Sequence, residues 1–117
     1  MTLFDKFLDA SVIESFDQRG YERHSQSFCE TDLDKDLTGR FALVTGANSG
    51  IGFATATELA KRNATVYLLC RNPKRAEDAV ERIVAQTQSK TVFWKQVDLS
   101  DLQSVRTASQ QLLESIE

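Results

Sequence analysis

The stretch Thr45-Gly46-Ala47-Asn48-Ser49-Gly50-Ile51-Gly52 decides how the surrounding chain folds. An apolar run at 41–44 precedes it and a helix-forming segment at 53–60 follows it, which predicts a turn from a buried strand into a helix. Gly46 would permit the tight turn, Gly50 would let an anion approach the backbone, and Gly52 would let the helix pack close to the sheet. Free amides at the helix start would then face a pyrophosphate. This order is typical of a dinucleotide site, although a glycine-rich turn can also close an ordinary loop.

Strands and helices alternate through the rest of the chain. We expect strands at 41–44, 65–70 and 91–97, which form a parallel sheet in the order third, second, first through right-handed crossovers. The run at 65–70 is nearly all apolar, as in a strand covered on both faces. Helices are expected at about 50–63, after the Asn72-Pro73 cap, and after a capping box at 100–103. Their expected buried residues are Ile51, Ala54, Thr55 and Leu59 in the first; Ala76, Ala79, Val80 and Ile83 in the second; and Leu102, Val105, Ala108, Leu112 and Leu113 in the third.

The pattern predicts the N-terminal part of a Rossmann-type, doubly wound α/β domain. The chain ends within the helix that would cross over to a fourth strand beside the first, so we expect an incomplete domain. The strand at 41–44 would then be an uncovered apolar edge, which favours homo-oligomers or aggregation.

A different pattern occupies residues 1–39. Apolar residues at 4, 8, 12 and 16, with 3, 7 and 13 beside them, predict an amphipathic helix that ends near Gly20. An acidic arm without periodicity, 21–38, would connect this helix to a partial Rossmann domain at 40–117. The helix is expected to dock onto the domain or a second subunit. Its acidic face disfavours an anionic membrane, although its phenylalanines would still permit weak insertion.

Composition excludes several classes of protein. The chain has 117 residues, 41% of them hydrophobic and 26% charged, and it has no apolar run near the ~20 residues that span a bilayer, so we expect a cytoplasmic protein. Residues 1–38 carry a formal charge of −5 and residues 39–117 carry +2, which suits a phosphate ligand but is too weakly basic for nucleic acid. Cys29 and Cys70 lack metal-ligand spacing and the single His24 forms no cluster, so no metal site is predicted.

The residues after the second strand predict which dinucleotide binds. An acid at this point would bind the ribose hydroxyls of NAD and repel a 2′-phosphate, but the sequence reads Cys70-Arg71-Asn72. Arg71 can clamp a 2′-phosphate with paired donors, which favours NADP(H) over NAD(H), and Ser49 would donate a second bond. The alternative is an arginine on a solvated loop.

Residues 40 to about 110 resemble the short-chain dehydrogenase/reductase family, whose glycine motif matches Thr45 to Gly52. The resemblance implies that Asn48 and Ile51 contact the cofactor, with the Ile51 amide on the pyrophosphate. It also implies that Asp98 holds the adenine amino group with support from the Leu99 backbone, although Asp98 can also serve the turn and helix start. Residues 20–23, 38–40, 46–52 and 97–100 look most like the dehydrogenase/reductase member 12 branch.

The family's catalytic motifs have no counterpart in this sequence. Its Asn-Asn-Ala-Gly strand end, active-site Ser and Tyr-x-x-x-Lys pair are missing, and Tyr21 and Tyr67 are followed four residues later by Ser25 and Arg71. Without a tyrosine and lysine to move the substrate proton, we expect no reaction by this chain alone. The sequence therefore predicts the NADP(H)-binding portion of an oxidoreductase for a carbonyl or alcohol substrate. The alternative is a non-catalytic nucleotide-binding or protein-interaction module.

Overall fold

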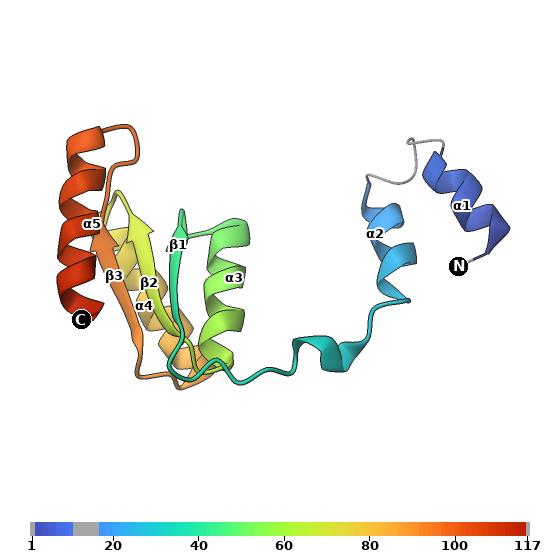
Figure 1. The fold of residues 1–117 in the computed structure, drawn as a ribbon, viewed down its shortest axis with the longest axis horizontal. Coiled ribbons are helices and arrows are strands. Elements are labelled where there is room, and N and C mark those ends of the chain that lie inside the picture. The colour runs from blue at the N-terminus through green and yellow to red at the C-terminus, as the bar shows by residue number, and fades with distance from the viewer. Residues whose placement is uncertain (1, 11–16, 117) are drawn as a thin grey trace. The chain divides into compact units, whose positions relative to one another are not determined.

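A computed structural model describes residues 2–10 and 17–116, which fall into two compact units, 1–35 and 36–117. The first unit contains α1 (Leu3–Ala10), α2 (Gln18–Ser25) and a 3-10 helix (Glu30–Leu33). The second unit contains β1 (Phe41–Thr45), α3 (Gly50–Lys61), β2 (Thr65–Cys70), α4 (Pro73–Thr87), β3 (Val92–Gln96) and α5 (Leu102–Ile116), shown in Figure 1. None of the helices that the structure describes combines the length and apolar character needed to cross a membrane.

The first unit differs from the sequence prediction. The predicted helix was expected to end near Gly20 and to be followed by an acidic connecting arm without periodicity, yet Gly20 is buried inside α2. Asp17 explains the separate helix, because its Oδ1 accepts a hydrogen bond from the Gly20 amide at 2.8 Å and caps a new N-terminus. Positions 11–16 of the predicted helix lie outside the described residues. The predicted connecting arm is therefore wrong for most of residues 21–33, which form the rest of α2 and the 3-10 helix.

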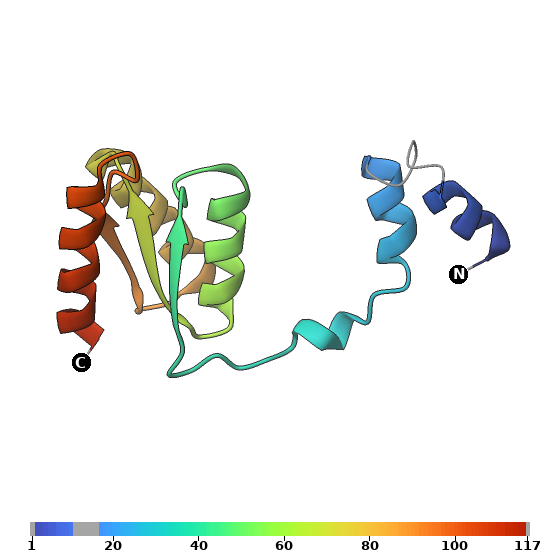
Figure 2. The ribbon, with the colours of Figure 1, turned by 45° about the horizontal axis from the view of Figure 1, so that its top comes forward.

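The second unit contains the predicted parallel sheet, with strand order β1-β2-β3. Phe41 pairs with Thr65, and Val66 pairs with Val92. All three strands point the same way, so the loops that leave their carboxyl ends gather at one edge of the sheet (Figure 2). The predicted fold class and strand order are confirmed, and the predicted strand bounds are met within one residue.

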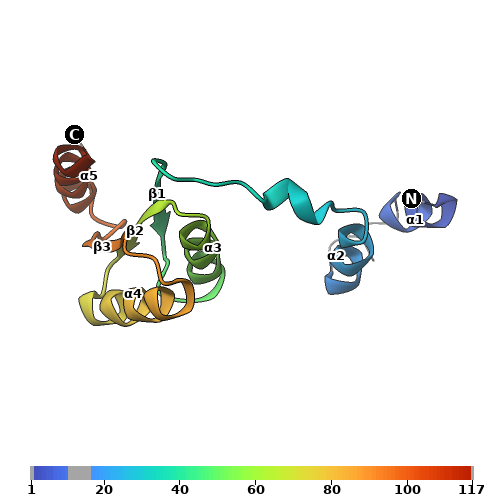
Figure 3. The same cartoon turned by 90° about the horizontal axis from the view of Figure 1, so that it is seen from below.

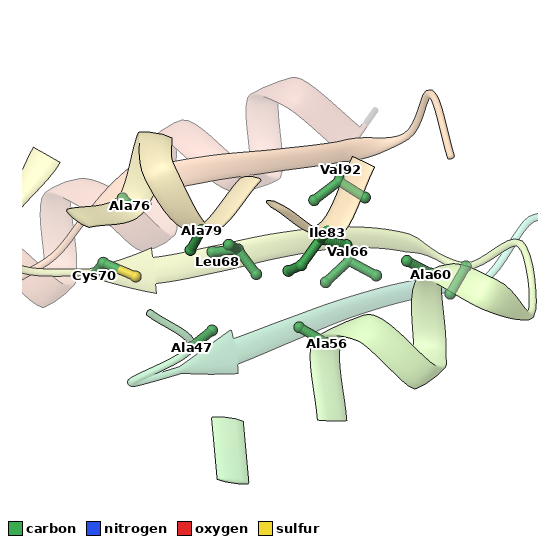
Figure 4. Packing of buried hydrophobic residues seen from close by; sticks show 11 residues of the cluster. Ala47, Ala56, Ala60, Val66, Leu68, Cys70, Ala76, Ala79, Ile83 and Val92 are labelled. Atoms are coloured by element: carbon green, nitrogen blue, oxygen red, sulfur yellow. The ribbon is translucent and has the colours of Figure 1, made fainter. Parts of the chain in front are cut away.

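The two faces of the sheet are covered unequally. Helices α3 and α4 lie on one face and α5 lies on the other (Figure 3). On the α3 and α4 face, Val66, Leu68 and Cys70 of β2 are buried, while Tyr67 and Leu69 on the opposite face are only half-buried. β2 is thus fully covered on one face only, whereas the sequence analysis predicted a strand covered on both faces. Figure 4 shows the core on the covered face, which includes Ala47, Ala56, Ala60, Val66, Leu68, Cys70, Ala76, Ala79, Ile83 and Val92.

The predicted inner face of α3 is wrong for Ile51, Ala54 and Thr55, whereas Leu59 is partly buried against the core as expected. The structure buries Ala56, Thr57 and Ala60, whereas Ile51 is 87% exposed. The cause is the close approach at Gly52, where an added Cβ would lie 2.5 Å from the Gly46 carbonyl oxygen. Gly52 therefore lies against the turn, and the small residues four and eight positions later follow it on the same face. Ala54 and Thr55, also expected inside, are exposed.

The predicted buried residues are confirmed for α4 and only in part for α5. In α4, Ala76, Ala79 and Ile83 are buried and Val80 is half-buried. In α5, Ala108 and Leu112 are buried, but Leu102 and Leu113 are 84% and 64% exposed. Leu113 lines an apolar groove between α5 and the sheet, and Leu102 lies outside it. We define the apolar groove by its lining residues Leu43, Leu69, Val97, Leu99, Val105, Ala108, Ser109, Leu112, Leu113 and Ile116.

Candidate functional site

Backbone hydrogen bonds join the three loops at the carboxyl edge of the sheet. The Gly46 amide donates to the Leu69 carbonyl at 3.2 Å, and the Val97 amide donates to the Cys70 carbonyl at 3.0 Å. Gln96 Nε2 also donates to the carbonyl of Arg71 at 3.3 Å. The glycine turn, the loop after β2 and the loop after β3 are therefore held side by side.

The glycine turn leaves open space where a ligand would lie. Gly46 and Gly50 have φ values of +59° and +57°, which L side chains rarely adopt, and a Cβ on either would meet nothing within 4 Å. Ser49 is the N-cap residue of α3, but its side chain makes no capping hydrogen bond. Since amides in the first turn of a helix lack intrahelical partners, the start of α3 offers donors for an anion. The turn therefore fits the pyrophosphate of a dinucleotide.

A cavity of about 330 Å³ lies at the ends of β1, β2 and β3. We refer to it as the strand-end cavity. Its lining brings together residues that the sequence analysis chose from three separate segments: Gly46 and Asn48, Arg71, and Asp98 and Leu99. Leu69, Cys70, Val97 and Ser100 complete the lining. The cavity thus combines apolar side chains with a few polar groups, as a site for an adenosine group requires.

Asp98 is held as a carboxylate in this cavity. The Ser100 hydroxyl donates to its Oδ1 at 2.6 Å and the Ser100 amide donates to the same oxygen at 3.0 Å. These hydrogen bonds, with a smaller contribution from the charge of Arg71, hold the pKa of Asp98 below its ordinary value. Both bonds end on Oδ1, so Oδ2 remains to accept a hydrogen bond from a ligand. The Asp98 amide donates a hydrogen bond to Ser104 Oγ at 3.0 Å, which fixes the backbone of Asp98.

A second cavity, of about 260 Å³, lies between the glycine turn and α4. We refer to it as the interhelix cavity, and it is lined by Asn48, Ser49, Arg75, Asp78, Ala79 and Arg82. The sequence analysis assigned Asn48 and Ser49 but missed Arg75, Asp78 and Arg82. Their spacing of three and four residues, next to the buried stripe of α4, was the signal that could have found them.

Two predictions about helix caps have different outcomes. Asn72 caps α4 as predicted, because its side chain accepts a hydrogen bond from the Arg75 amide at 3.2 Å. Asn72 lines neither of the two cavities. The capping box predicted at Ser100 is wrong, because Asp101 Oδ1 accepts from the Gln103 amide at 2.9 Å while Ser100 is bonded to Asp98.

Sequence comparison places the chain in a family. The profile described as short chain dehydrogenase matches residues 40–117, so this chain belongs to the short-chain dehydrogenase/reductase family and contains its cofactor-binding region. The human dehydrogenase/reductase SDR family member 12 is 45% identical over 92 residues. That match covers 79% of this chain and 29% of the human protein, so the chain spans under a third of its relative's length.

Solved structures show the same fold. The N-domain of a bacterial malonyl-CoA reductase, solved with NADP, matches with a TM-score of 0.66 and 27% identity over 70% of this chain and 15% of that one. The Pseudomonas aeruginosa RhlG/NADP active-site complex matches with a TM-score of 0.61 and 33% identity over 68% of this chain and 30% of that one. Both matched proteins carry NADP in those structures.

Proposed function

We propose that residues 40–117 bind NADP(H) as the cofactor-binding portion of an oxidoreductase that acts on a carbonyl or alcohol substrate. The observation that carries the proposal is the meeting of the open glycine turn, Arg71 and Asp98 at the carboxyl edge of one parallel sheet. The NADP found with two structural relatives supports the choice of cofactor.

Each group in the strand-end cavity has a proposed role. The turn at Gly46 and Gly50, with the amide of Ile51, receives the pyrophosphate. Asp98 accepts a hydrogen bond from the adenine amino group and the Leu99 backbone supports the ring. Arg71 contributes a permanent positive charge that favours a 2′-phosphate over the bare ribose of NAD(H). These contacts serve only the adenosine and pyrophosphate side, so we expect the chain alone to bind the cofactor without turning over a substrate.

Calorimetric titration of the 117-residue chain with NADP(H) and NAD(H) tests the proposal. NADP(H) should bind more tightly, and Arg71→Asp should shift the preference toward NAD(H) because the new carboxylate repels the 2′-phosphate. Arg106→Asp is the matched control, since this exposed arginine lies on α5 and lines neither cavity. An unchanged preference in Arg71→Asp would refute the role assigned to Arg71.

A second candidate is a nucleotide-binding or protein-interaction module without catalysis. It is favoured by the first unit, where Leu3, Phe4 and Phe7 of α1 are 86%, 68% and 69% exposed, since exposed apolar side chains on one helix mark contact surfaces. The reading frame discriminates between the two candidates. A Tyr-x-x-x-Lys motif encoded downstream would support the oxidoreductase, and its absence there would favour the module.

A further inference from the structure

The segment between α2 and β1 carries a threonine with acidic residues on both sides. Thr31 lies in the single turn of 3-10 helix, Glu30–Leu33, that follows α2 along the chain (Figure 1). Acids lie one position before it and one, three and five positions after it, at Glu30, Asp32, Asp34 and Asp36. Lys35 is the one base between positions 26 and 36, and all of these residues are exposed. The segment therefore presents an acidic sequence around a hydroxyl group to the solvent.

The hydroxyl of Thr31 is held differently from hydroxyls inside the helices. Ser25, Thr55 and Ser109 each donate a hydrogen bond to a backbone carbonyl three or four residues earlier. The Thr31 hydroxyl instead contacts the thiol of Cys29, with 3.0 Å between Oγ1 and Sγ. Because a thiol is a weak donor and a weak acceptor, this contact restrains the hydroxyl little. Thr31 thus offers an exposed oxygen that can act as a nucleophile.

The backbone around Thr31 is held by local hydrogen bonds. The Asp32 amide donates to the Cys29 carbonyl at 3.1 Å, and the Asp34 amide donates to the Thr31 carbonyl at 3.1 Å. No residue of this short helix is buried. Since exposed segments with few buried contacts open at a low free energy, the turn can extend to enter the active site of another enzyme.

We propose that Thr31 is a phosphorylation site for a serine/threonine kinase whose substrate groove is basic. The surrounding carboxylates complement such a groove, and the same charges disfavour a kinase that selects basic substrates. The Thr31 oxygen attacks the γ-phosphorus of ATP, the new O–P bond forms as the bond to ADP breaks, and the hydroxyl proton passes to the catalytic aspartate of the kinase. The inference is independent of the proposed function, because no residue from 26 to 36 lines either cavity.

Ser27 is the nearest competing hydroxyl. It has an acid three positions later, at Glu30, but Phe28 and Cys29 follow it directly. Its hydroxyl also donates to the His24 carbonyl at 2.8 Å, at the end of α2. Thr31 has acids on both sides and contacts a thiol, so the structure favours Thr31.

A phosphate on Thr31 would change the chemistry of Cys29. The hydrogen bond with the Thr31 side chain is the main reason why the pKa of the Cys29 thiol lies below its ordinary value. Phosphorylation removes the hydroxyl donor and adds a charge of about −1.5 to −2 beside the sulfur, which disfavours the thiolate. Repulsion from Glu30 and Asp32 should also open the 3-10 turn. Phosphorylation of Thr31 would therefore suppress the reactivity of Cys29.

Incubation of the 117-residue chain with a purified acidophilic serine/threonine kinase and Mg-ATP tests the inference. Mass spectrometry should find a single phosphate on Thr31, which Thr31→Val should abolish and Thr31→Ser should keep. Asp34→Asn should slow the reaction by about tenfold, because it removes a charge-assisted contact with the kinase. Glu22→Gln is the matched control, since it removes the same charge from α2 and should leave the rate within about twofold.

Alkylation of Cys29 by iodoacetamide at neutral pH provides a second measurement. Phosphorylation should slow it by about threefold or more, because the thiolate becomes rarer. Thr31→Val should slow it less, since this variant loses the hydroxyl but gains no charge. Cys70, which is buried, serves as the reference thiol in the same molecule.

Four outcomes would overturn the inference. These are an unmodified Thr31, a phosphate on Ser27 in its place, equal slowing in Asp34→Asn and Glu22→Gln, and equally fast modification of Thr31 by an arginine-directed kinase. Equal alkylation rates for Cys29 in the phosphorylated chain and in Thr31→Val would refute the effect of the phosphate charge on the thiol.

Discussion

At the scale of single residues, the glycines of the turn act through two different physical effects. Gly46 and Gly50 are needed for their positive φ values, and the space beside them is open. Gly52 has no such φ value, but its missing Cβ allows the helix to approach the backbone of Gly46 and Ala47. Substitutions at these positions should therefore have unequal consequences.

Gly52→Ala should destabilise the second unit more than Gly46→Ala. The new Cβ would lie 2.5 Å from the Gly46 carbonyl oxygen and 2.9 Å from its carbon, and backbone atoms move less readily than a flexible side chain. We expect a loss of about 3 kcal/mol in the free energy of unfolding, at the upper end of overpacking effects. Gly46→Ala and the control Gly39→Ala introduce backbone strain without a clash and should cost about 1–2 kcal/mol. Urea unfolding followed by the fluorescence of Trp94, the single tryptophan, measures the free energy of unfolding of all three variants. A loss in Gly52→Ala no larger than in the other two would contradict the close approach as the reason for Gly52.

Ser100→Ala should raise the pKa of Asp98 toward its ordinary value of 3.8, because the hydroxyl bond is the largest cause of its lowering. A lowered carboxyl pKa stabilises the folded state above the unfolded pKa, and this contribution disappears as the pH falls through the folded value. The effect is therefore confined to acidic solution, and Asp98 should stay ionised at neutral pH in both proteins. NMR titration of the Asp98 carboxyl carbon measures the shift. Ser109→Ala is the control, since its hydroxyl donates to the Val105 carbonyl, and an equal shift there would refute the explanation.

Arg71 and Asp98 could be placed from the sequence because parallel strands deliver their carboxyl ends to one edge, whatever the detailed packing. The arginines that line the same cavity as Ser49 could not be placed in this way. Arg75 and Arg82 reach its cavity only because α4 packs beside α3 at a particular rotation, which depends on contacts between helices distant in sequence.

At the scale of secondary structure, the strand positions and the Asn72-Pro73 helix start were more predictable than the cap of α2 or the inner face of α3. The run at 65–70 and the Asn72-Pro73 start needed only local information. Helix α2 was missed because the acidic residues around it were read as a connecting arm, while Asp17 supplies its cap. The face of α3 was missed because the contact at Gly52 fixes its rotation more strongly than its larger apolar side chains do.

The two ends of α4 should respond oppositely to substitution. Asn72→Ala removes the hydrogen bond to the Arg75 amide and should lower the free energy of unfolding by about 1 kcal/mol. Gln88, at the other end, has a φ of +58°, a left-handed backbone conformation that glycine adopts without strain. Gln88→Gly should therefore stabilise the unit by about 0.5 kcal/mol, after the conformational entropy that glycine loses on folding is subtracted. Urea unfolding measures both, and changes of the same sign would contradict this account.

At the scale of the whole molecule, β1 leaves an apolar surface at the edge of the sheet. Phe41 and Leu43 are 52% and 51% exposed, and Leu43 lines the apolar groove beside α5. An exposed edge strand next to an apolar groove is a surface on which another chain can pair or pack. We therefore predict that this edge promotes self-association of the 117-residue chain.

Leu43→Lys should weaken that self-association by about tenfold or more, because the substitution removes roughly 1.5–3 kcal/mol of apolar burial and places a charge at the edge. Sedimentation velocity over a range of protein concentrations measures it. Leu33→Lys is the control, since Leu33 is 68% exposed but belongs to the first unit. An equal effect of both substitutions would exclude the β1 edge as the cause.

The position of Cys70 gives the chain an internal reporter of opening. Cys70 is 4% exposed next to the glycine turn, and its burial raises the pKa of its thiol. Cys29 is exposed, and a hydrogen bond with Thr31 lowers the pKa of its thiol. An alkylating reagent should therefore modify Cys29 directly and Cys70 only during local opening of the sheet edge. The ratio of the two rates, followed by mass spectrometry, would report the opening equilibrium, and a bound dinucleotide should slow only the modification of Cys70.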